Sequence, residues 1–326
     1  MTNPEISIVM PAYGVEKYIA AAIESVLKQD FQDWELLVVL DGLKDKSDEV
    51  AKSFERKDSR IIVLEKENGG LSDARNYGLD RSRGRYVHFF DSDDTIEPDF
   101  YTNMYSAIKK CDKDLVICGY YVDTVSGNNT TLSEHRFIDC LNPVPANFDL
   151  DLVGKFVNFA WNKLFRRDFL VENDLYYQKG LFGYEDVEFM SRYMQYHPDI
   201  MFIPYMGYHY FNRERETLSR VFDQDLVKRA AGNLHCYRTL LKNFTDDEIS
   251  ITNAFSKAVL GAYKALFPLV MEQTRNRLRQ IKWVLNEKAL YSLLPAKVES
   301  NLIDKIFYYL IRHKCSLIIY LYYKFR

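Results

Sequence analysis

Short apolar runs alternate with segments of helical periodicity through the first 121 residues, and this alternation narrows the folds open to the chain. The apolar runs are rich in β-branched and aromatic residues and nearly free of charge, as buried strands are. Strands and helices in such alternation form βα units around a mostly parallel sheet, so we predict an α/β domain. The strands are expected at 5–10, 34–40, 61–64, 86–90 and 115–121, and the helices at 15–29, 47–56, 71–80 and 100–110.

The pattern changes after residue 121. Residues 123–150 are rich in Asn, Thr and Ser and contain Pro143 and Pro145, which favours an irregular excursion of the kind that shapes a substrate site. Short helices and strands mix up to about residue 215, and the periodicity is then helical to the end. We predict an α/β domain over residues 1–218 and a mainly helical C-terminal region over residues 219–326.

Composition and charge argue against several classes of protein. The 326 residues are 47% hydrophobic and 27% charged, an ordinary balance for a globular protein with a core. The formal net charge of −3 gives no reason to expect a nucleic-acid partner. Five scattered cysteines without a CxxC pair indicate reduced thiols of a cytosolic protein. We expect no signal peptide and no run of about 18 apolar residues that could span a bilayer, hence a soluble or peripherally attached protein.

The expected strand at 86–90 ends in three carboxylates, Asp91, Asp93 and Asp94. Acids packed so closely repel one another unless a cation lies among them. A hard divalent ion, Mg²⁺ or Mn²⁺, shared with a phosphorylated ligand would supply that cation. Ligands of open α/β sheets bind outside the carboxyl ends of the strands, where these acids lie. The alternative is an acidic turn that begins the next helix, with Asp94 or Thr95 as N-cap, and these residues alone leave both interpretations open.

Two other strand ends also carry side chains suited to a ligand. Tyr13 lies just past the first expected strand, and Asp41 lies just past the second. An aromatic face, an acid that accepts N–H or O–H bonds and a metal-binding acid pair together suit a nucleotide diphosphate. Stacking and hydrogen bonding would hold the base, and the cation would neutralise the pyrophosphate. Because three strand ends agree, this inference is stronger than any one motif.

Four motifs occur in order over roughly the first 95 residues: Ser7–Tyr13, Glu35–Gly42, Asn68–Asn76 and Asp91–Asp94. Together they resemble the family 2 glycosyltransferases, which are inverting enzymes that use nucleotide-diphosphate sugars. The resemblance implies the GT-A fold, a Rossmann-like, mostly parallel central sheet flanked by helices. Segments at 161–165 and 183–189 look like the acceptor-side segments of that family, so the resemblance covers about residues 5–220. Gly14, where the family usually has Asn, and residues 43–47 depart from the family pattern without removing a catalytic group.

The resemblance implies a set of nucleotide-binding residues at the strand ends. Pro11 and Tyr13 would flank the nucleobase, and Asp41 would accept a bond from its ring N–H. Arg75 would lie against the nucleotide. Asp91 would contact the ribose and a metal-bound water.

The same resemblance assigns the metal and the catalytic base. Asp93, with Asp91, would ligate Mn²⁺ or Mg²⁺, Asp94 would assist Asp93 or bind the sugar, and Asp186 matches the base. An inverting transfer needs one carboxylate to take the proton from the acceptor hydroxyl, while a metal stabilises the leaving diphosphate. The alternative is that Glu185 and Asp186 only begin a helix, where acids favour the positive end of the helix dipole.

Besides Asp94, four residues are candidates for contact with the donor sugar or the acceptor: Trp161, Glu185, His209 and Arg213. Trp161 would lie at the rim of the site, and its alternative role is packing. His209 and Arg213 match the segment after the base that, in the family, folds over the donor diphosphate. A histidine among aromatic residues is otherwise usually structural, so that alternative stays open for His209.

Residues 301–326 contain two apolar and aromatic runs separated by Arg312, His313 and Lys314. Basic residues combined with Tyr, Phe, Leu and Ile fit an interfacial helix on an anionic membrane. The alternative is that this segment packs onto the catalytic domain or onto a second subunit of a homo-oligomer.

We therefore expect an inverting hexosyl- or N-acetylhexosaminyltransferase that moves one sugar from a nucleotide-diphosphate donor, by family habit a UDP-sugar, to a hydroxyl of a glycan. The glycan acceptor is expected to be lipid-linked, in the synthesis of a surface polysaccharide such as capsule. The expected location is the cytoplasm, at the inner face of the plasma membrane. The alternative is a non-catalytic partner of the same fold that binds glycan or stabilises another glycosyltransferase. The presence of Asp91, Asp93 and Asp186 favours the enzyme.

Overall fold

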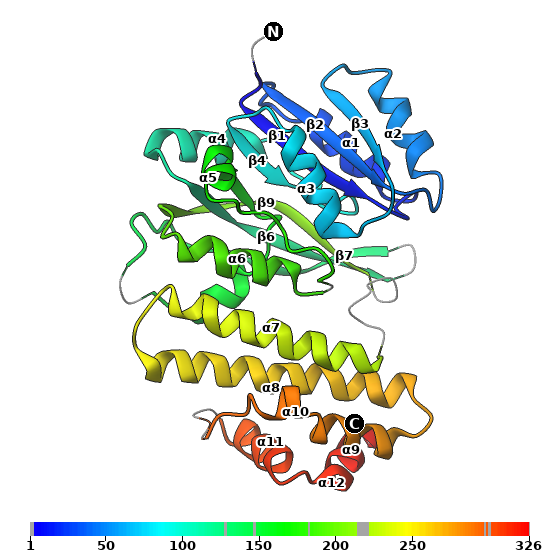
Figure 1. The fold of residues 1–326 in the computed structure, drawn as a ribbon, viewed down its shortest axis with the longest axis vertical. Helices are drawn as coiled ribbons and strands as arrows, with labels where there is room; N and C mark the ends of the chain where they lie inside the picture. The colour runs from blue at the N-terminus through cyan, green and yellow to red at the C-terminus, as the bar shows by residue number, and fades with distance from the viewer. Residues whose placement is uncertain are drawn as a thin grey trace.

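The computed structural model describes residues 3–126, 129–145, 148–181, 183–213, 222–296, 298 and 301–325. Within them, nine strands form one sheet that is flanked by helices, and a stack of further helices lies beneath it (Figure 1). The N-terminus lies at the sheet end of the molecule and the C-terminus lies among the last helices at the other end. The predicted α/β architecture with a helical C-terminal region is confirmed.

The first part of the chain alternates strands and helices as predicted. Its elements are β1 (Ile6–Ala12), α1 (Ile19–Leu27), β2 (Trp34–Asp41), α2 (Ser47–Glu55), β3 (Ile61–Lys66), α3 (Leu71–Arg81) and β4 (Tyr86–Phe89). The four strands are parallel and lie in the order β3-β2-β1-β4. Every residue of β1 and β2 is buried, which explains their nearly uninterrupted apolar sequence. Because the strands are parallel, the residues that follow β1, β2 and β4 lie at one edge of the sheet.

The second part of the sheet mixes directions. Its elements are β5 (Thr95–Ile96), α4 (Phe100–Cys111), β6 (Leu115–Ser126), β7 (Asn129–Arg136), the π-helix η1 (Val153–Val157), β8 (Lys163–Arg166), α5 (Arg167–Glu172), α6 (Glu185–Gln195) and β9 (Ile200–Arg213). β8 runs antiparallel to β4 and to β6, whereas β9 is parallel to β6. Two reversals restore the original direction, so β6 and β9 end at the same edge as β4.

The irregular excursion predicted at 123–150 is in part a β-hairpin, so that prediction was wrong over its first half. β6 continues to Ser126 and pairs with β7, with a shift of register between Val122 and Asp123. Threonine and valine at positions 122–125 favour a strand. The polar residues that suggested a loop belong to a strand pair instead, and the irregular stretch begins only after Arg136.

α3 packs closely against β1 and β2 at Gly78, a residue without a side chain. A Cβ atom on Gly78 would stand 3.2 Å from Cγ2 of Val39 and closer still to Cγ1 of Val9. Only glycine allows this approach without displacing the helix from the sheet. Arg75 lies about one turn earlier on α3, so the same contact sets where Arg75 reaches the carboxyl edge.

The C-terminal region consists of α7 (Gln224–Lys242), α8 (Glu248–Gln273), α9 (Arg277–Asn286), α10 (Lys288–Tyr291), α11 (Leu302–Arg312) and α12 (Ser316–Lys324). α7 packs between α6 and α8, and α9, α11 and α12 pack on α8 (Figure 1). The predicted boundary between residues 218 and 219 lies outside the described residues.

α8 is, among the described helices, the one long and apolar enough to cross a membrane, although we expected no such run. In this fold 56% of its most apolar window is buried. Phe267 of α8 packs against Phe307 of α11, and α7 covers another part of its surface. We therefore describe α8 as the central helix of the C-terminal layer and not as a membrane span.

Candidate active site

The predicted site residues lie at the carboxyl edge of the sheet. Tyr13 follows β1, Asp41 ends β2 and Asp91 lies just past β4. Arg75 on α3 and Asp186 in the first turn of α6 bring charged groups to the same edge. The shared direction of the parallel strands places Asp41 and Asp91 at the same edge of the sheet, at the ends of β2 and β4 with β1 between them.

Arg75 links two predicted site carboxylates that are far apart in the chain. Its Nη1 donates to Oδ1 of Asp186 at 2.5 Å, and its Nη2 donates to Oδ1 of Asp91 at 2.9 Å. The side chain is 1% exposed, and its guanidinium lies 5.0 Å from the ring centre of Tyr177. A buried guanidinium requires such pairing, because an unpaired charge away from water is strongly unfavourable. Arg75 therefore connects the predicted donor side of the site with the predicted catalytic base.

Asp91 is held in an environment that resists its ionisation. Burial raises the pKa of the Asp91 carboxyl to about 6, against the opposing effect of the Arg75 guanidinium. The nearby carboxylates of Asp186 and Asp93 raise the pKa further. A cation added among these acids would favour the ionised form, as the sequence argument required.

Asp93 is the most open of the three acids after β4, since its side chain is 41% exposed. Nη1 of Arg213 donates to Oδ2 of Asp93 at 2.9 Å, and Nη2 donates to the main-chain carbonyl of Asp93 at 2.5 Å. The guanidinium also lies 4.1 Å from the ring centre of Tyr18. The predicted partnership of Arg213 with the diphosphate end of the site thus has a geometric basis, because Arg213 is already next to the predicted metal ligand.

The donor set suits a metal shared with a phosphorylated ligand and not a metal enclosed by protein. Among the described residues, no group of three or more His, Cys, Asp or Glu side chains could hold a metal ion. Asp91 and Asp93 together supply carboxylate oxygens from one short segment. Mg²⁺ is commonly bound in this way, by one or two carboxylates with substrate phosphates and water as the other ligands. These residues fit the predicted Mn²⁺ or Mg²⁺, which stays a prediction.

Asp94 differs from its two neighbours because its side chain points into the protein. Its carboxylate accepts hydrogen bonds from the Tyr208 hydroxyl at 2.8 Å and from the Phe211 main-chain N–H at 2.9 Å. Burial raises the pKa of this carboxyl well above its usual range. Asp94 ties the end of β4 to β9, and this geometry favours a structural role over the predicted contact with the sugar. The alternative that Asp94 or Thr95 caps the next helix is wrong, since α4 begins only at Phe100.

Asp41 organises the glycine-containing loop that precedes α3. Its carboxylate accepts bonds from the main-chain N–H groups of Gly69 and Gly70, both at 2.8 Å, and from Nζ of Lys66 at 2.6 Å. Its main-chain carbonyl accepts a bond from Asn68. Our reading of the sequence missed Lys66, although its position at the end of β3, beside Asp41 in the parallel register, could have indicated it. The predicted contact of Asp41 with a base stays a prediction.

Tyr13 presents an exposed ring beside two departures from the family pattern. The ring is 47% exposed, whereas Pro11 is buried within β1. Nζ of Lys44 lies 4.9 Å from the ring centre of Tyr13. Gly14 has a φ of 70°, and a Cβ there would stand 2.8 Å from Cδ of Lys44. The two departures are therefore in contact, at the predicted base-binding residue.

Asp186 and Glu185 occupy the first turn of α6. Besides its bond to Arg75, Asp186 accepts a long bond of 3.4 Å from the Ala160 main-chain N–H. Burial raises the pKa of Glu185, and the adjacent Asp186 raises it further. Stabilisation of these acids by the helix dipole remains compatible with this geometry, but it does not explain why Asp186 is joined to Asp91 through Arg75.

Lys163 is a buried cation near Asp186 that we did not predict. It is fully buried at the start of β8, and its Nζ donates to the Phe156 carbonyl at 2.6 Å and to Oδ1 of Asn162 at 2.7 Å. Burial lowers the pKa of Lys163 to about 7, although the charge of Asp186 opposes this shift. A lysine inside the apolar segment 161–165 was a signal that could have drawn attention to it.

Trp161 and His209 make their contacts with other side chains of the protein. Trp161 is 4% exposed and stacks on Tyr208 with a centroid distance of 4.5 Å. Nδ1 of His209 lies 2.7 Å from a carboxylate oxygen of Asp123, and Nε2 lies 3.0 Å from one of Glu97. For both residues the geometry favours the structural alternative, and the structure does not bring them into the group formed by Arg75 and its partners.

A mostly parallel sheet with a cationic and acidic cluster at its carboxyl edge fits the GT-A fold that the sequence resemblance implied. The family description "Glycosyl transferase family 2" matches residues 7–173, more than half of the chain. The chain belongs to this family and is a glycosyltransferase that uses a nucleotide-sugar donor.

Known relatives agree with this membership. EpsH of Bacillus subtilis (strain 168) is 30% identical over 241 residues, which cover 73% of this chain and 69% of EpsH. The minor teichoic acid biosynthesis protein GgaB of the same organism is 40% identical over 105 residues, 31% of this chain and 12% of GgaB. The crystal structure of S. aureus TarS 1–349 in complex with UDP superimposes with a TM-score of 0.64 at 19% identity, covering 96% of this chain and 88% of that one. The likeness to TarS confirms the GT-A fold.

Proposed function

We propose that this glycosyltransferase inverts the anomeric centre while moving one sugar from a UDP-sugar to a hydroxyl of a lipid-linked glycan. The observation that carries the proposal is the Arg75 bridge, which holds the carboxylate of Asp186 beside the donor-side acid Asp91. An inverting transfer needs a base for the acceptor and acids that bind the metal of the donor. The Arg75 bridge places these two groups next to each other. Synthesis of a surface polysaccharide fits the relative GgaB, a minor teichoic acid biosynthesis protein, and a uracil base fits the UDP bound to TarS.

Each residue of the edge has a role in this mechanism. Asp186 takes the proton from the attacking hydroxyl, and Arg75 keeps its carboxylate oriented. Tyr13 stacks on the base, and Asp41 fixes the loop at Gly69 and Gly70 against which the nucleotide lies.

Asp91 and Asp93 would hold Mn²⁺ or Mg²⁺, which supplies charge neutralisation for the leaving diphosphate. Arg213, already on Asp93, adds a second positive group at this end. The donor's phosphates would compete with Asp93 for Arg213, because a guanidinium binds phosphate and carboxylate alike. A cytoplasmic location, at the inner face of the plasma membrane, suits an enzyme of UDP-sugars and its free cysteines.

Thermal unfolding with UDP, GDP, dTDP and CDP, each with and without Mn²⁺, tests the donor site. We expect UDP with Mn²⁺ to raise Tm, and Asp93→Ala to abolish the shift. Asp168→Ala on α5, where the carboxylate is 70% exposed, is the matched control and should keep the shift. Stabilisation by no nucleotide would overturn the donor site and favour a non-catalytic partner of the same fold.

The stereochemical part of the proposal needs a separate measurement. Proton NMR of the product formed from an α-linked UDP-sugar should show a β-linkage. A product with the α-linkage retained would contradict inversion and the role of Asp186 as base.

A further inference from the structure

α11 and α12 present an apolar surface to solvent at the end of the molecule opposite the sheet (Figure 1). The exposed fractions of its side chains run from 40% at Leu321 to 79% at Phe325. We call this surface the α11–α12 face. It consists of Leu302, Ile303, Ile306, Tyr309, Leu317, Ile318, Leu321, Tyr322 and Phe325.

The two helices are held in the fold by other residues. Phe307 and Ile311 of α11 and Ile319 of α12 point inward and are buried. Asp304 of α11 forms an ion pair with Lys264 of α8. The exposed residues are therefore not the ones that dock the helices, and nine large apolar side chains exposed on two helices in contact with each other indicate an external partner.

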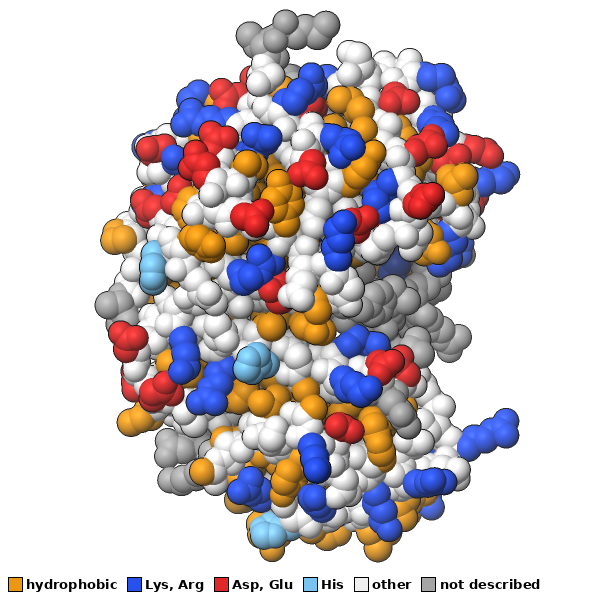
Figure 2. Space-filling view, viewed as in Figure 1, with side chains coloured by type: hydrophobic (Ala, Val, Ile, Leu, Met, Phe, Trp, Pro, Cys, Tyr) orange, Lys and Arg blue, Asp and Glu red, His pale blue; other side chains and the backbone are white. Residues whose placement is uncertain are grey.

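The last part of the chain, which includes the α11–α12 face, carries a large excess of basic residues. Residues 274–326 contain eleven Lys and Arg against three acidic residues, a formal charge of +8. The preceding 273 residues contain the remaining 32 basic and 43 acidic residues, a formal charge of −11. Figure 2 shows apolar and basic side chains together at this end of the molecule. A chain that is acidic as a whole thus has one strongly basic pole.

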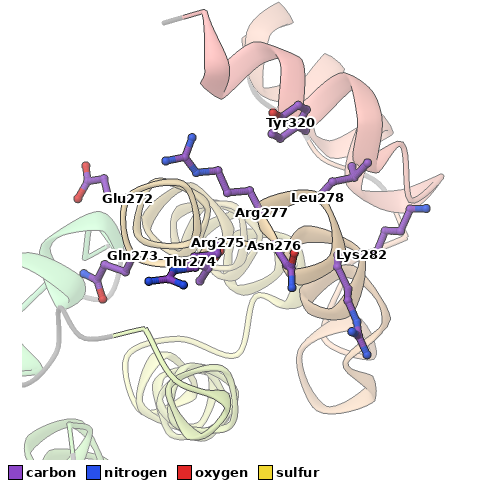
Figure 3. A pocket seen from close by; sticks show the side chains of 10 residues that line it. Glu272, Gln273, Thr274, Arg275, Asn276, Arg277, Leu278, Lys282 and Tyr320 are labelled. Carbon is purple, nitrogen blue, oxygen red and sulfur yellow. The ribbon is translucent and has the colours of Figure 1, made fainter.

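An open groove of about 870 Å³ lies beside the face, between the end of α8, α9 and Tyr320 of α12 (Figure 3). Arg275, Arg277, Arg279 and Lys282 line it, together with the acidic Glu272. All four basic side chains are exposed, and no ion pair is found for them within the described part of the chain. Guanidinium groups so placed can bind phosphate.

We propose that the α11–α12 face binds the surface of an anionic lipid bilayer. The apolar side chains would enter the boundary between headgroups and acyl chains, where tyrosine is also favourable, while the arginines of the groove contact lipid phosphates. Charge selects this occupant over a second copy of the chain, because a symmetric dimer through this face would bring two basic poles together. This interaction goes beyond sugar transfer and does not depend on it.

Flotation with lipid vesicles tests the proposal directly. The full chain should bind vesicles of phosphatidylcholine with added phosphatidylglycerol, bind pure phosphatidylcholine much more weakly, and lose binding as salt is raised. The variant Arg275→Gln/Arg277→Gln/Arg279→Gln should bind roughly a hundredfold more weakly, at about fivefold for each basic residue near the surface. The variant Ile303→Ser/Ile306→Ser/Phe325→Ser should also lose most of its binding.

Matched controls separate this effect from general changes of charge or hydrophobicity. Ile249→Ser removes an isoleucine that is 71% exposed in the first turn of α8, and Lys109→Gln/Lys110→Gln removes two exposed charges on α4. Both controls should bind anionic vesicles as the wild type does, and all variants should keep the wild-type Tm.

Three outcomes would overturn the proposal. One is absence of binding to anionic vesicles, and another is equal binding to neutral and anionic ones. The third is a dimer in solution, measured by light scattering, that Ile306→Ser dissociates, since the face would then serve a second copy.

Discussion

At the scale of single residues, Arg75 joins the two sides of the site through a planar fork that lysine lacks. Its two terminal nitrogens reach Asp186 and Asp91 separately, whereas one ammonium group cannot hold both in the same positions. We expect Arg75→Lys to keep the fold and to lower the rate of sugar transfer by about a hundredfold, the effect of a displaced catalytic group. Steady-state transfer kinetics with Tm measured in parallel would test this.

Arg81→Lys is the matched control on the same helix. Arg81 is exposed and its guanidinium lies over the ring of Tyr77, away from the carboxylates. Its replacement should leave the transfer rate unchanged. A wild-type rate in Arg75→Lys would contradict the positioning of Asp186 by Arg75.

Lys163 gives the protein a pH-dependent stability. Its folded pKa, about 7, lies below the ordinary value of 10.5, so between these values the unfolded chain binds a proton that the folded chain does not. Stability then rises with pH in this window, by up to about 1.4 kcal/mol per pH unit. Lys163→Met lacks this contribution. Urea unfolding measures the unfolding free energy of both proteins at pH 7 and at pH 9. Between these pH values, the unfolding free energy of the wild type should increase by about 2 kcal/mol relative to that of Lys163→Met.

The comparison with Met cancels other titrating groups, which both proteins share. Lys110→Met, at an exposed position on α4, should show no such movement with pH. A difference between wild type and Lys163→Met that stays constant from pH 7 to pH 9 would show that Lys163 remains protonated in the fold.

The sequence indicated the carboxylates of the site better than their partners. Asp41 and Asp91 come at the ends of strands, so their position at the edge of the sheet could be predicted from the strand pattern alone. The contacts of Lys66 and Lys163 depend on residues brought near by tertiary packing, which periodicity does not reveal. Nor could the sequence show that the Asp94 side chain points inward, because this orientation depends on Tyr208, more than a hundred residues away.

At the scale of elements, the docking of α3 through Gly78 determines the position of Arg75. Gly78→Ala would place a methyl group against Val9 and Val39, two buried strand residues with no room to move. We expect a loss of about 1–3 kcal/mol in the free energy of unfolding. Transfer should also slow, since a shifted helix displaces Arg75. Urea unfolding and transfer kinetics measure the two effects.

Gly261→Ala in α8 is the matched control, because nothing lies within 4 Å of the added methyl group. Alanine should there stabilise the helix by about 0.5–1 kcal/mol. Equal effects at the two glycines would contradict close docking of α3.

The type of each element was predicted correctly where the sequence is periodic. The prediction was wrong where it relied on composition instead of periodicity. The strands β1 to β4 and the helices α1 to α4 have clear periods of two or 3.6 residues, or short apolar runs, and they were predicted, whereas the two-residue strand β5 was not. The β6–β7 hairpin was taken for a loop, since its Asn- and Thr-rich residues resemble a turn region. The β6 strand of this hairpin also pairs with β9, which lies some eighty residues later in the chain and which no local pattern indicates.

At the scale of the whole molecule, the charges divide into an acidic part with the catalytic edge and a basic helical pole. This division can be counted in the sequence, whereas the exposure of the α11–α12 face could not, because apolar helices are more often buried. The structure shows that the segment with the basic excess forms the helices at the end of the molecule opposite the sheet (Figure 1). Layers α7 and α8 lie between the pole and the sheet (Figure 1).

This separation predicts that donor binding and lipid binding can be removed independently, because perturbations at distant sites act additively. Asp93→Ala should lose the rise in Tm with UDP and Mn²⁺ and still float with anionic vesicles. Arg275→Gln/Arg277→Gln/Arg279→Gln should keep the rise in Tm and lose flotation. Both measurements use the full chain. The control Asp168→Ala should keep both the rise in Tm and the flotation. Loss of both properties in either variant, at an unchanged Tm without ligand, would mean that one surface serves nucleotide and lipid phosphates, and would overturn the assignment of separate sites.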